Sequence, residues 1–450
     1  MIVEEELDAI LTAGLEQTGA PAVVAGVFRD GELVYQLARG MADLEPEAPA
    51  TVDMAFEVGS VSKHFTAVAL LQQVEAGTLT LDDRLGDHLA DRLERLPEAW
   101  WPVTLRQLLS HTSGIPDYEA AATYSVYEEP TSAAEVLAIV ADRPMDFEPG
   151  SEYRYSNTGY YLLCLVLEAV TGKTTLELFE SSLFEPSAMR TASVGPPAEA
   201  HMAQGHKPEN YENQRGLLEV PPIASRSSLG AGAVTLTLAD WGGWEKALST
   251  GALVGSSSLE ASYTRSRLSS GEEIDYALGM VVSPRRGERR YRHSGQTAGF
   301  TTSLERYPER GLAILLLANR YGGRLRQLAS QVALAVMPDL RYEKWPLLTE
   351  VSVDETAIAK RALEQAVLGT EPLDLLSDSL RDFAVAERFA DERRQIAASV
   401  ANLQAFEAID RTVVGSTRRL VFRGRYPEGL RYWTMRFDDD ALVGLSWDEE

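Results

Sequence analysis

Two groups of strand-forming segments, separated by a long helical region, constrain the fold of this 450-residue chain more than any other feature. The first group is Ala22–Phe28 and Glu32–Arg39, and the second is Arg290–His293, Thr301–Tyr307 and Gly311–Leu317. The dipeptide Asp30-Gly31 predicts a tight hairpin within the first group. Because strands at both ends of a region must pair to bury their apolar faces, we predict an antiparallel sheet built from distant sequence, with a helical subdomain beside it, in an α+β fold.

The region between the two groups, about residues 80 to 280, has the pattern of helices joined by many loops. We predict helices over residues 3–18, from Ser60 to Gly77, and over Val103–Ser110, Ala133–Ala141, Thr158–Thr171 and Arg324–Val336. The stretch Gly195–Ser228 is rich in Pro, Gly, Asn and Ser and predicts a long surface loop. A cleft between sheet and helices is the natural place for a site, and we expect this loop to border it.

A proline-containing stretch at 341–352 is followed by a new series of predicted helices and strands, and we interpret this stretch as a linker. It separates a first domain, 1–340, from a small α+β domain, 353–450. The predicted helices there are Glu355–Leu368, Leu373–Phe389 and Asp391–Leu403, and the predicted strands are Ala405–Val414, Arg418–Arg425, Leu430–Phe437 and Leu442–Trp447. We expect this domain to pack against the cleft or to mediate homo-oligomerisation.

The composition excludes several classes of function. The net charge of −25 argues against nucleic acid and anionic membrane surfaces as partners, because both attract basic patches. The single cysteine, Cys164, excludes an internal disulfide and a thiolate metal cluster. The acidic start Met1–Glu6 lacks the apolar core of an export signal, and no apolar run reaches the length of a membrane span. We therefore expect a cytoplasmic protein.

Ser60 and Lys63 stand three residues apart at the start of a predicted helix, after the extended segment Ala55–Gly59. Residues at that spacing share a helix face, so the Lys63 amine can reach the Ser60 hydroxyl. A lysine shielded from water can take the serine proton, and the N–H of Ser60 would face a developing oxyanion. Taken alone, the same residues also fit a helix cap followed by a solvated lysine.

A second polar element, Tyr155-Ser156-Asn157, lies on the loop that leads into the next apolar helix. If that loop is extended, Tyr155 and Asn157 point the same way. A phenol near an ammonium group has a lowered pKa, so Tyr155 can serve as a base and later as an acid. The alternative is a tyrosine-rich amphipathic loop without a catalytic role.

The third element is His293-Ser294-Gly295-Gln296, at the end of a predicted strand. A glycine there lets a substrate lie close to the backbone, whose N–H groups can complete an oxyanion hole. An ordinary turn between two sheet strands explains the same residues.

In this order and with these separations, the three elements resemble those of the serine β-lactamase and penicillin-binding protein superfamily. The likeness is greatest to class C β-lactamases, family VIII carboxylesterases and D-aminopeptidases. The supporting stretches are Phe56–Gly59, Leu108–Pro116 and Gly230–Gly232 before Trp241. The resemblance covers about residues 3 to 338 and implies a β-lactamase-like fold.

The resemblance also implies a role for each residue. Ser60 would be the acylated nucleophile, and Lys63 would share its proton with Tyr155, the general base for acylation. Asn157 would hydrogen-bond the carbonyl side chain of the substrate and orient Lys63. The N–H groups of Ser60 and Gln296 would form the oxyanion hole.

One departure from the superfamily pattern concerns the substrate. The superfamily usually carries Lys-Thr-Gly where this chain has His293-Ser294-Gly295. That lysine supplies a permanent charge for a substrate carboxylate and keeps the tyrosine pKa low, whereas a histidine is mostly neutral at pH 7. Efficient β-lactam hydrolysis is therefore not expected, and the histidine is more similar to the esterase and D-aminopeptidase branches.

We hypothesise a serine hydrolase that forms an acyl-enzyme, acting on carboxylic esters with short or medium acyl chains. The alternative is a D-aminopeptidase or amidase that acts on small peptides or D-amino-acid amides. β-Lactamase activity is less favoured, and so is a penicillin sensor that is acylated without turnover. The loops Tyr118–Pro130 and Gly195–Ser228 would set the choice, and the aromatic-rich start of the first, Tyr118–Tyr127, would line an acyl pocket or cover the core.

Other site types find little support in the chain. A G-x-S-x-G elbow, as in α/β-hydrolases, and an H-E-x-x-H metal motif are both missing from the sequence. His201 and His206 lie in the long loop at a spacing that suits no common metal site, and we expect both to be solvated. We expect His111 to anchor its own turn. No metal and no cofactor are therefore expected.

Overall fold

The structure, a computed structural model, describes residues 4–449 except 94–95, 122–131, 199–200, 211–215, 224–225, 227, 391–392, 395–396, 398–399, 401, 415–416, 428 and 440. The chain divides into two compact units, Met1–Ala335 and Val336–Glu450. Both contain helices and antiparallel sheet, so the predicted α+β class is confirmed. The predicted domain limits, 1–340 and 353–450, stay a prediction.

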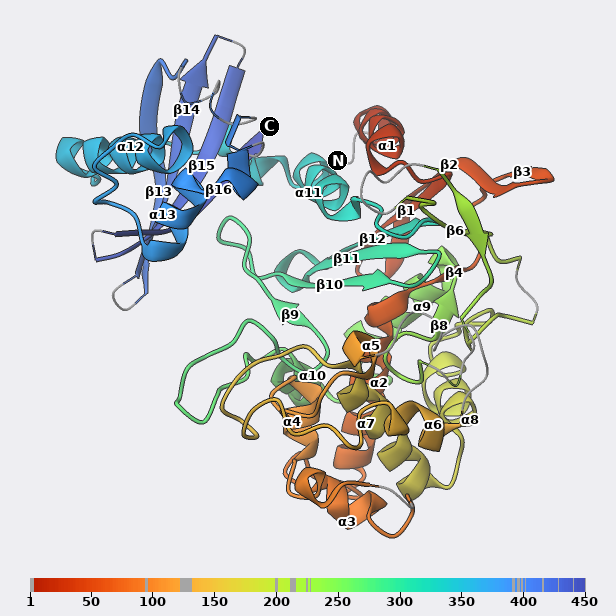
Figure 1. The fold of residues 1–450 in the computed structure, drawn as a ribbon. Helices are drawn as coiled ribbons and strands as arrows, with labels where there is room; N and C mark the ends of the chain where they lie inside the picture. Colours follow the sequence, from red (N-terminus) through yellow and green to blue (C-terminus); the bar gives the residue numbers. More distant parts are fainter. Residues whose placement is uncertain are drawn as a thin grey trace. The chain divides into compact units, whose positions relative to one another are not determined.

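A seven-stranded antiparallel sheet forms the centre of the first unit, in the order β3-β2-β1-β12-β11-β10-β9 (Figure 1). Its strands are β1 (Ala22–Arg29), β2 (Glu32–Leu44), β3 (Glu47–Pro49), β9 (Val281–Val282), β10 (Tyr291–Gln296), β11 (Thr301–Tyr307) and β12 (Leu312–Ala318). β1 pairs with β12 from Val23 opposite Ala318 to Arg29 opposite Leu312. The two distant strand groups therefore meet as predicted. β1 and β12 are apolar on both faces, so each must be buried within the sheet and under helices.

Helices cover both faces of this sheet. α1 (Glu4–Thr18) and α11 (Leu325–Val336) lie on one side, and α9 (Leu238–Ser249) lies on the other (Figure 1). A Cβ added to Gly26 of β1 would lie 3.0 Å from Leu238, so α9 packs directly on the strand. The buried helix α2 (Ser62–Glu75) leads from the sheet into the helical subdomain.

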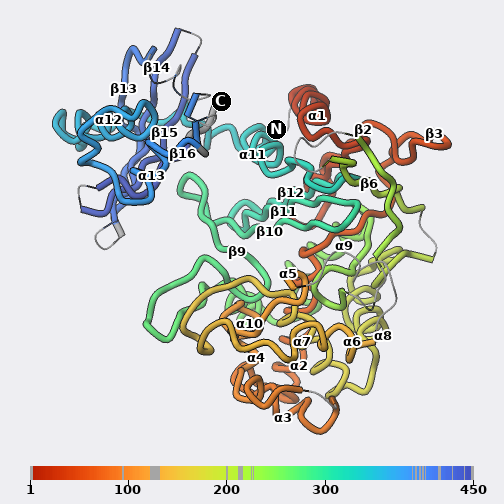
Figure 2. The backbone as a smooth tube through the Cα atoms, in the orientation of Figure 1, coloured from red at the N-terminus to blue at the C-terminus, as the bar shows by residue number. Residues whose placement is uncertain are grey.

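The helical subdomain occupies most of the chain between β3 and β9, and the tube in Figure 2 lets its path be followed. Its helices are α3 (Leu85–Leu89), α4 (Leu105–Leu109), α5 (Tyr118–Ala121), α6 (Ala133–Ala138), α7 (Asn157–Thr171), α8 (Thr175–Phe179) and α10 (Ser256–Ser262). A small sheet of β4 (Phe56–Glu57), β8 (Val234–Leu236) and β5 (Ser193–Val194) joins it to the residues before α2. Among the described residues, every helix is too short or too polar to cross a bilayer.

The stretch Gly195–Ser228 is more ordered than the predicted surface loop. It contains β6 (Gly205–Lys207) and β7 (Leu218–Val220), which pair with each other. His206 is fully buried, so the expectation that it is solvated is wrong. Its backbone N–H donates to Gly299 O at 3.2 Å and its carbonyl accepts from Tyr321, so contacts with distant residues hold it inside. His201 is exposed, as expected, and lies 3.4 Å from Asp43.

Asn319, at the end of β12, joins three parts of the first unit. Its side-chain oxygen accepts the N–H of Ala22 at 2.7 Å. Its amide nitrogen donates to the carbonyls of Met41, Ala42 and Gln204 at 3.1–3.2 Å. Since Asn319 is completely buried, each of these polar groups would lose its partner if the amide were removed.

The second unit is a four-stranded antiparallel meander with helices packed on it. It consists of α12 (Val353–Leu368), α13 (Asp378–Val385), β13 (Ala405–Val414), β14 (Thr417–Tyr426), β15 (Gly429–Asp438) and β16 (Ala441–Glu449). Its core includes Leu363 of α12 and Trp433 of β15. Tyr342, in the stretch predicted as a linker, packs within this unit against Tyr432, at 5.1 Å between ring centroids.

The helix predicted over Leu373–Phe389 begins later than expected. Leu373 has a φ of +59°, which is incompatible with a helix, and α13 starts only at Asp378. The intervening backbone pairs with β16 instead: Leu442 donates to Leu375 O at 2.7 Å, and Ser377 donates to Leu442 O at 3.0 Å. Most of the helix predicted over Asp391–Leu403 lies outside the described residues.

We predict that Asn319→Leu lowers the free energy of unfolding of the first unit by about 3 kcal/mol or more, because buried polar groups lose their partners. Chemical denaturation measures this loss. Gln327→Leu makes the same change on an exposed position of α11 and should shift stability by less than about 0.5 kcal/mol. Equal, small effects of both substitutions would mean that Asn319 does not hold the unit together.

Candidate active site

Ser60 lies where the chain turns sharply between β4 and α2. Gly59 has a φ of +52°, and residues Gly59–Val61 form one turn of 3-10 helix before α2 begins at Ser62. The hydroxyl of Ser62 is buried and accepts the N–H of Val234 at 3.0 Å, so this second serine of the motif serves the structure. Ser60 instead is partly exposed and lines a cavity.

Lys63 is fully buried, and its amine has three neighbours. Nζ lies 3.1 Å from Ser60 Oγ, 2.7 Å from Asn157 Oδ1 and 2.8 Å from Ala231 O. The two carbonyl oxygens can only accept hydrogen bonds, whereas the serine hydroxyl can also donate one. A neutral amine therefore spends its two N–H groups on the carbonyls and turns its lone pair to the Ser60 hydroxyl.

The electrostatics of the site favour that neutral amine. Burial lowers the pKa of Lys63 to about 7, and the negative charges of Glu119 and Asp117 oppose this shift. Nζ lies 4.8 Å from the centroid of the Tyr155 ring and 5.4 Å from that of Tyr160. Near pH 7 both protonation states of the amine are accessible, and both satisfy the same three contacts.

Tyr155 lies beside the serine but keeps its proton. Burial raises the pKa of its phenol well above the ordinary value, and the neighbouring Ser60 side chain opposes this only in part. The prediction that a nearby charge lowers this pKa is therefore wrong, since desolvation dominates. The phenol oxygen is buried and completes no hydrogen bond with any described residue.

His111 holds the loop that carries Tyr155. Its ring packs on the Tyr155 ring at 4.2 Å between centroids, and its Nδ1 accepts the N–H of Ser156 at 3.1 Å. Arg154 donates its N–H to the His111 carbonyl at 2.9 Å. The histidine thus anchors a distant loop rather than only its own turn, which sequence spacing could not indicate.

Asn157 is the first residue of α7 rather than part of the preceding loop. Its backbone N–H donates to Asp117 Oδ1 at 2.8 Å, which fixes the start of the helix. Since its side-chain oxygen accepts from Lys63, its amide nitrogen remains a donor.

His293 is buried and electrically neutral. Its Nδ1 lies 2.7 Å from the carbonyl of Ser294 and must donate, so its Nε2 accepts from the hydroxyl of Tyr276 at 3.0 Å. Burial and the nearby charge of Lys63 lower the pKa of His293 to about 3. Tyr276 could not be predicted as a partner of His293 from the sequence, because it comes from a loop before β9.

Gly59 and Gly295 bring two backbone segments into contact. A Cβ on Gly295 would collide with Val58 O and lie 3.2 Å from the N of Ser60, and a Cβ on Gly59 would lie 2.5 Å from the N of Gln296. Only glycines allow this approach. The N–H groups of Ser60 and Gln296 are thereby placed on neighbouring backbone segments at the same cavity.

All predicted site residues come together here. Ser60, Tyr155 and the stretch His293–Gln296 line a cavity of about 570 Å³, while Lys63 and Asn157 lie behind the serine. Further lining residues that the sequence analysis missed include Tyr153, Tyr276, Arg292, Ser303, Arg324 and Arg326. Strand alternation could have indicated Arg292, which shares a face with Ser294.

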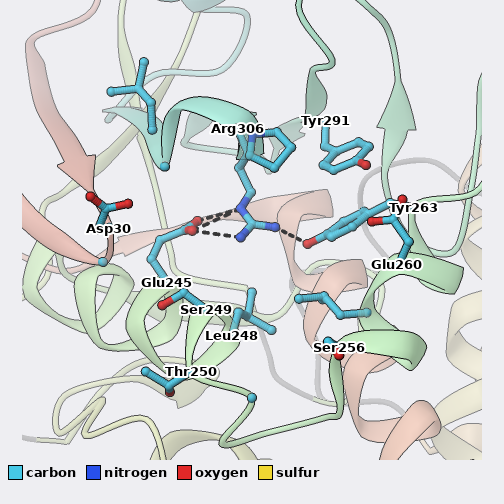
Figure 3. A pocket seen from close by; sticks show the side chains of 16 residues that line it. Asp30, Glu245, Leu248, Ser249, Thr250, Ser256, Glu260, Tyr263, Tyr291 and Arg306 are labelled. Carbon is cyan, nitrogen blue, oxygen red and sulfur yellow. Dashed lines mark hydrogen bonds and ion pairs between the residues drawn. The ribbon is translucent and has the colours of Figure 1, made fainter.

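A second cavity, of about 520 Å³, lies elsewhere in the first unit (Figure 3). Arg306 there forms a buried two-pronged ion pair with Glu245, with Nε 2.8 Å from Oε1 and Nη2 2.9 Å from Oε2. The Tyr263 ring stacks on Tyr291 at 3.9 Å between centroids, and its hydroxyl lies 3.2 Å from His64 Nε2. Within the described residues, no group of three His, Cys, Asp or Glu side chains is placed to hold a metal ion.

Comparison with known families agrees with this geometry. The family model described as Beta-lactamase matches residues 7–337. The chain belongs to the β-lactamase family. The resemblance found in the sequence, and the β-lactamase-like fold that it implied, are confirmed.

Relatives in the β-lactamase family carry several names. Penicillin-binding protein 4* of Bacillus subtilis is 28% identical over 64% of this chain and 66% of its own length. D-aminopeptidase of Brucella anthropi is 29% identical over 70% of this chain and 58% of its own length. Esterase EstB of Burkholderia gladioli is 31% identical over 48% of this chain and 58% of its own length. The chain therefore spans less than two thirds of the length of these relatives.

One solved structure resembles nearly the whole chain. It is that of the octameric penicillin-binding protein homologue from Pyrococcus abyssi, with a TM-score of 0.64 and 20% identity, covering 99% of this chain and 96% of that one. At this identity, the likeness shows that the fold is shared, including the unit that follows the β-lactamase family domain.

We predict that Gly295→Ala displaces β10 from the turn that carries Ser60, because the added methyl group collides with Val58 O. We expect hydrolytic activity to fall by about a hundredfold or more, the usual cost of losing an oxyanion-hole donor. Gly242→Ala in α9 is the control, since its Cβ would meet the nearest atom at 3.4 Å. Kinetics and thermal unfolding of both variants, measured together, separate loss of the site from loss of the fold.

Proposed function

We propose that this chain is a serine hydrolase that forms an acyl-enzyme on Ser60 and acts on carboxylic esters with short or medium acyl chains. The observation that carries the proposal is the buried amine of Lys63, 3.1 Å from Ser60 Oγ, whose other neighbours can only accept hydrogen bonds. Such an amine accepts the serine proton without a rearrangement of heavy atoms. The family membership and the hydrolase names of two relatives agree with this reaction class.

Acylation begins when neutral Lys63 takes the hydroxyl proton of Ser60 as Oγ bonds to the ester carbonyl carbon. The carbonyl oxygen becomes an oxyanion, which the N–H groups of Ser60 and Gln296 stabilise. When the tetrahedral intermediate collapses, the bond to the alcohol oxygen breaks, and the proton passes to the leaving alcohol. Water then attacks the acyl carbon while Lys63 takes one of its protons. When this second tetrahedral intermediate collapses, the bond to Ser60 Oγ breaks, Lys63 returns the proton to Oγ, and the carboxylic acid leaves.

Tyr155 acts in this scheme as a neutral proton relay rather than as a phenolate base. Its phenol lies beside Ser60 and holds its proton firmly, so it can donate to the leaving oxygen while it receives a proton from Lys63. Asn157 holds Lys63 with its oxygen and offers its amide nitrogen to a carbonyl group of the substrate.

The wall of the cavity favours esters over the amino-acid amides that an aminopeptidase hydrolyses. An aminopeptidase needs an acidic group to bind the substrate ammonium, and none of the described lining residues is Asp or Glu. His293 is neutral and cannot replace the lysine of the β-lactamase pattern.

Cytoplasmic residence and homo-oligomerisation stay predictions.

Replacement of the serine is the direct test. Ser60→Ala should lower hydrolysis of 4-nitrophenyl butanoate by at least about a thousandfold, as expected for loss of a nucleophile. Ser257→Ala, at an exposed position of α10, should retain full activity. Mass spectrometry of the quenched wild type should find a butanoyl group on Ser60.

The same assay separates the alternatives. Ester hydrolysis that persists in Ser60→Ala would exclude Ser60 as the nucleophile. Faster turnover of D-amino-acid 4-nitroanilides than of esters would favour the D-aminopeptidase alternative, and rapid hydrolysis of a cephalosporin would favour a β-lactamase. An adduct on Ser60 that never decays would indicate a sensor.

A further inference from the structure

The start of helix α7 is bound by a residue from an earlier part of the chain. Its N-cap residue, Ser156, makes no side-chain hydrogen bond to the helix, although serine commonly caps a helix at this position. The N–H of Asn157, the first residue of α7, instead donates to Asp117 Oδ1 at 2.8 Å. The cap is therefore supplied from 40 positions away in the sequence.

Asp117 has a fixed position at the start of α7. The hydroxyl of Thr158 donates to Pro116 O at 2.8 Å and accepts the N–H of Tyr118 at 2.9 Å. The residues on both sides of Asp117 are thus bound to the second residue of α7, and Thr158 is fully buried. The short helix α5, which follows Asp117, lies beside α7 (Figure 1).

A short chain of hydrogen bonds runs from Asp117 to the amine of Lys63. Asp117 Oδ1 accepts the N–H of Asn157, and Asn157 Oδ1 accepts from Lys63 Nζ at 2.7 Å. One residue therefore joins the carboxylate to the amine that faces Ser60. Loss of the first hydrogen bond would free the start of α7 and, with it, the side-chain oxygen that holds Lys63.

Asp117 also adds negative charge near this amine. Burial lowers the pKa of Lys63 to about 7, and the charges of Glu119 and Asp117 oppose that shift. Burial raises the pKa of Asp117, whereas the N–H of Asn157 and the charge of Lys63 favour its ionised form. The neighbouring phenol of Tyr118 is neutral, because burial raises its pKa well above the ordinary value. Glu119 adds to the same charge, whereas Asp117 combines its charge with a hydrogen bond to the start of α7.

The ionisable rings around Lys63 are neutral. Burial holds the pKa of His111 well below its ordinary value and lowers that of His293 to about 3. Burial also raises the pKa of the Tyr155 and Tyr160 phenols well above the ordinary value. Within the described residues, the charge that acts on the Lys63 amine therefore comes from the two carboxylates.

We propose that Asp117 is a positioning residue for the reaction. It holds Lys63 in place through Asn157, and its charge supports the ammonium that Lys63 becomes on taking the serine proton. This inference rests on the proposed function, in which Lys63 is the base. A serine cap would also satisfy the N–H of Asn157, so helix capping alone does not require a carboxylate here. A fixed negative charge stabilises the buried ammonium as it forms, because electrostatic interactions are stronger away from water.

The pH dependence of ester hydrolysis tests this role, because a purely structural residue would not shift it. The substrate, 4-nitrophenyl butanoate, has no ionisable group, and 4-nitrophenol is measured at its isosbestic wavelength, so the profile reports the enzyme. The wild-type kcat/KM should rise with pH through about 7, as Lys63 loses its proton. Asp117→Asn keeps an oxygen that can accept the N–H of Asn157 but removes the charge. In this variant the rise should move to lower pH by about 0.5 pH unit or more, because the ammonium has lost a stabilising charge.

Three further variants separate the charge from other effects. Asp117→Glu keeps the charge and should give a profile close to that of the wild type. Asp91→Asn removes a carboxylate at an exposed position and should leave the profile unchanged. Asp117→Ser is a second uncharged variant, which should shift the profile in the same direction even if Asp117→Asn folds poorly. Thermal unfolding of each variant shows which of them fold.

The outcomes distinguish this inference from the function on which it rests. A profile that stays at the wild-type pH in the uncharged variants, while Ser60 still gains its acyl adduct, would overturn the inference alone. So would equal shifts in Asp117→Asn and Asp91→Asn, because the effect would then be one of net charge. If both uncharged variants fail to fold while Asp117→Glu folds, the carboxylate serves the structure and the inference fails. If the wild type hydrolyses no ester and Ser60 gains no adduct, the proposed function and the inference both fail.

Discussion

The burial of one amine is the constraint on which the rest of this site depends. Lys63 can stay inside the protein because Asn157 and Ala231 accept its hydrogen bonds, and because burial brings its pKa down to about 7. An exposed lysine would be protonated and could not receive the proton of Ser60. The buried, high-pKa phenol of Tyr155 complements it, since one group takes a proton while the other holds one to give.

The residues of this site come from segments that are far apart in the sequence of the first unit. Pairing of β1 with β12 closes the sheet and places β10, with Gly295, against the turn that contains Ser60. The helical subdomain brings Asn157 at the start of α7, and His111 packs on the ring of Tyr155. The cavity wall therefore combines rigid strands with helix starts, which favours fixed positions for the reacting groups.

Local signals in the sequence predicted much of this arrangement, and tertiary contacts account for what they missed. The spacing of Ser60 and Lys63 and the alternation of the strands are short-range patterns, so both could be read from the chain. The burial of His206 depends on residues nearly a hundred positions away, and the late start of α13 depends on pairing with β16. The pKa of Tyr155 could not be predicted either, because the sequence shows a nearby cation but not the extent of desolvation.

Titration of Lys63 tests the central claim most directly. The chain contains six lysines, so ¹³C labelling of the lysine side chains gives a spectrum simple enough to follow each Cε resonance with pH. We predict that one resonance titrates near pH 7, is missing in Lys63→Ala, and belongs to an amine that is neutral and able to act as a base above that pH. If the resonance lost in Lys63→Ala titrates near the ordinary lysine value of about 10.4, Lys63 is protonated at neutral pH and cannot be the base that activates Ser60.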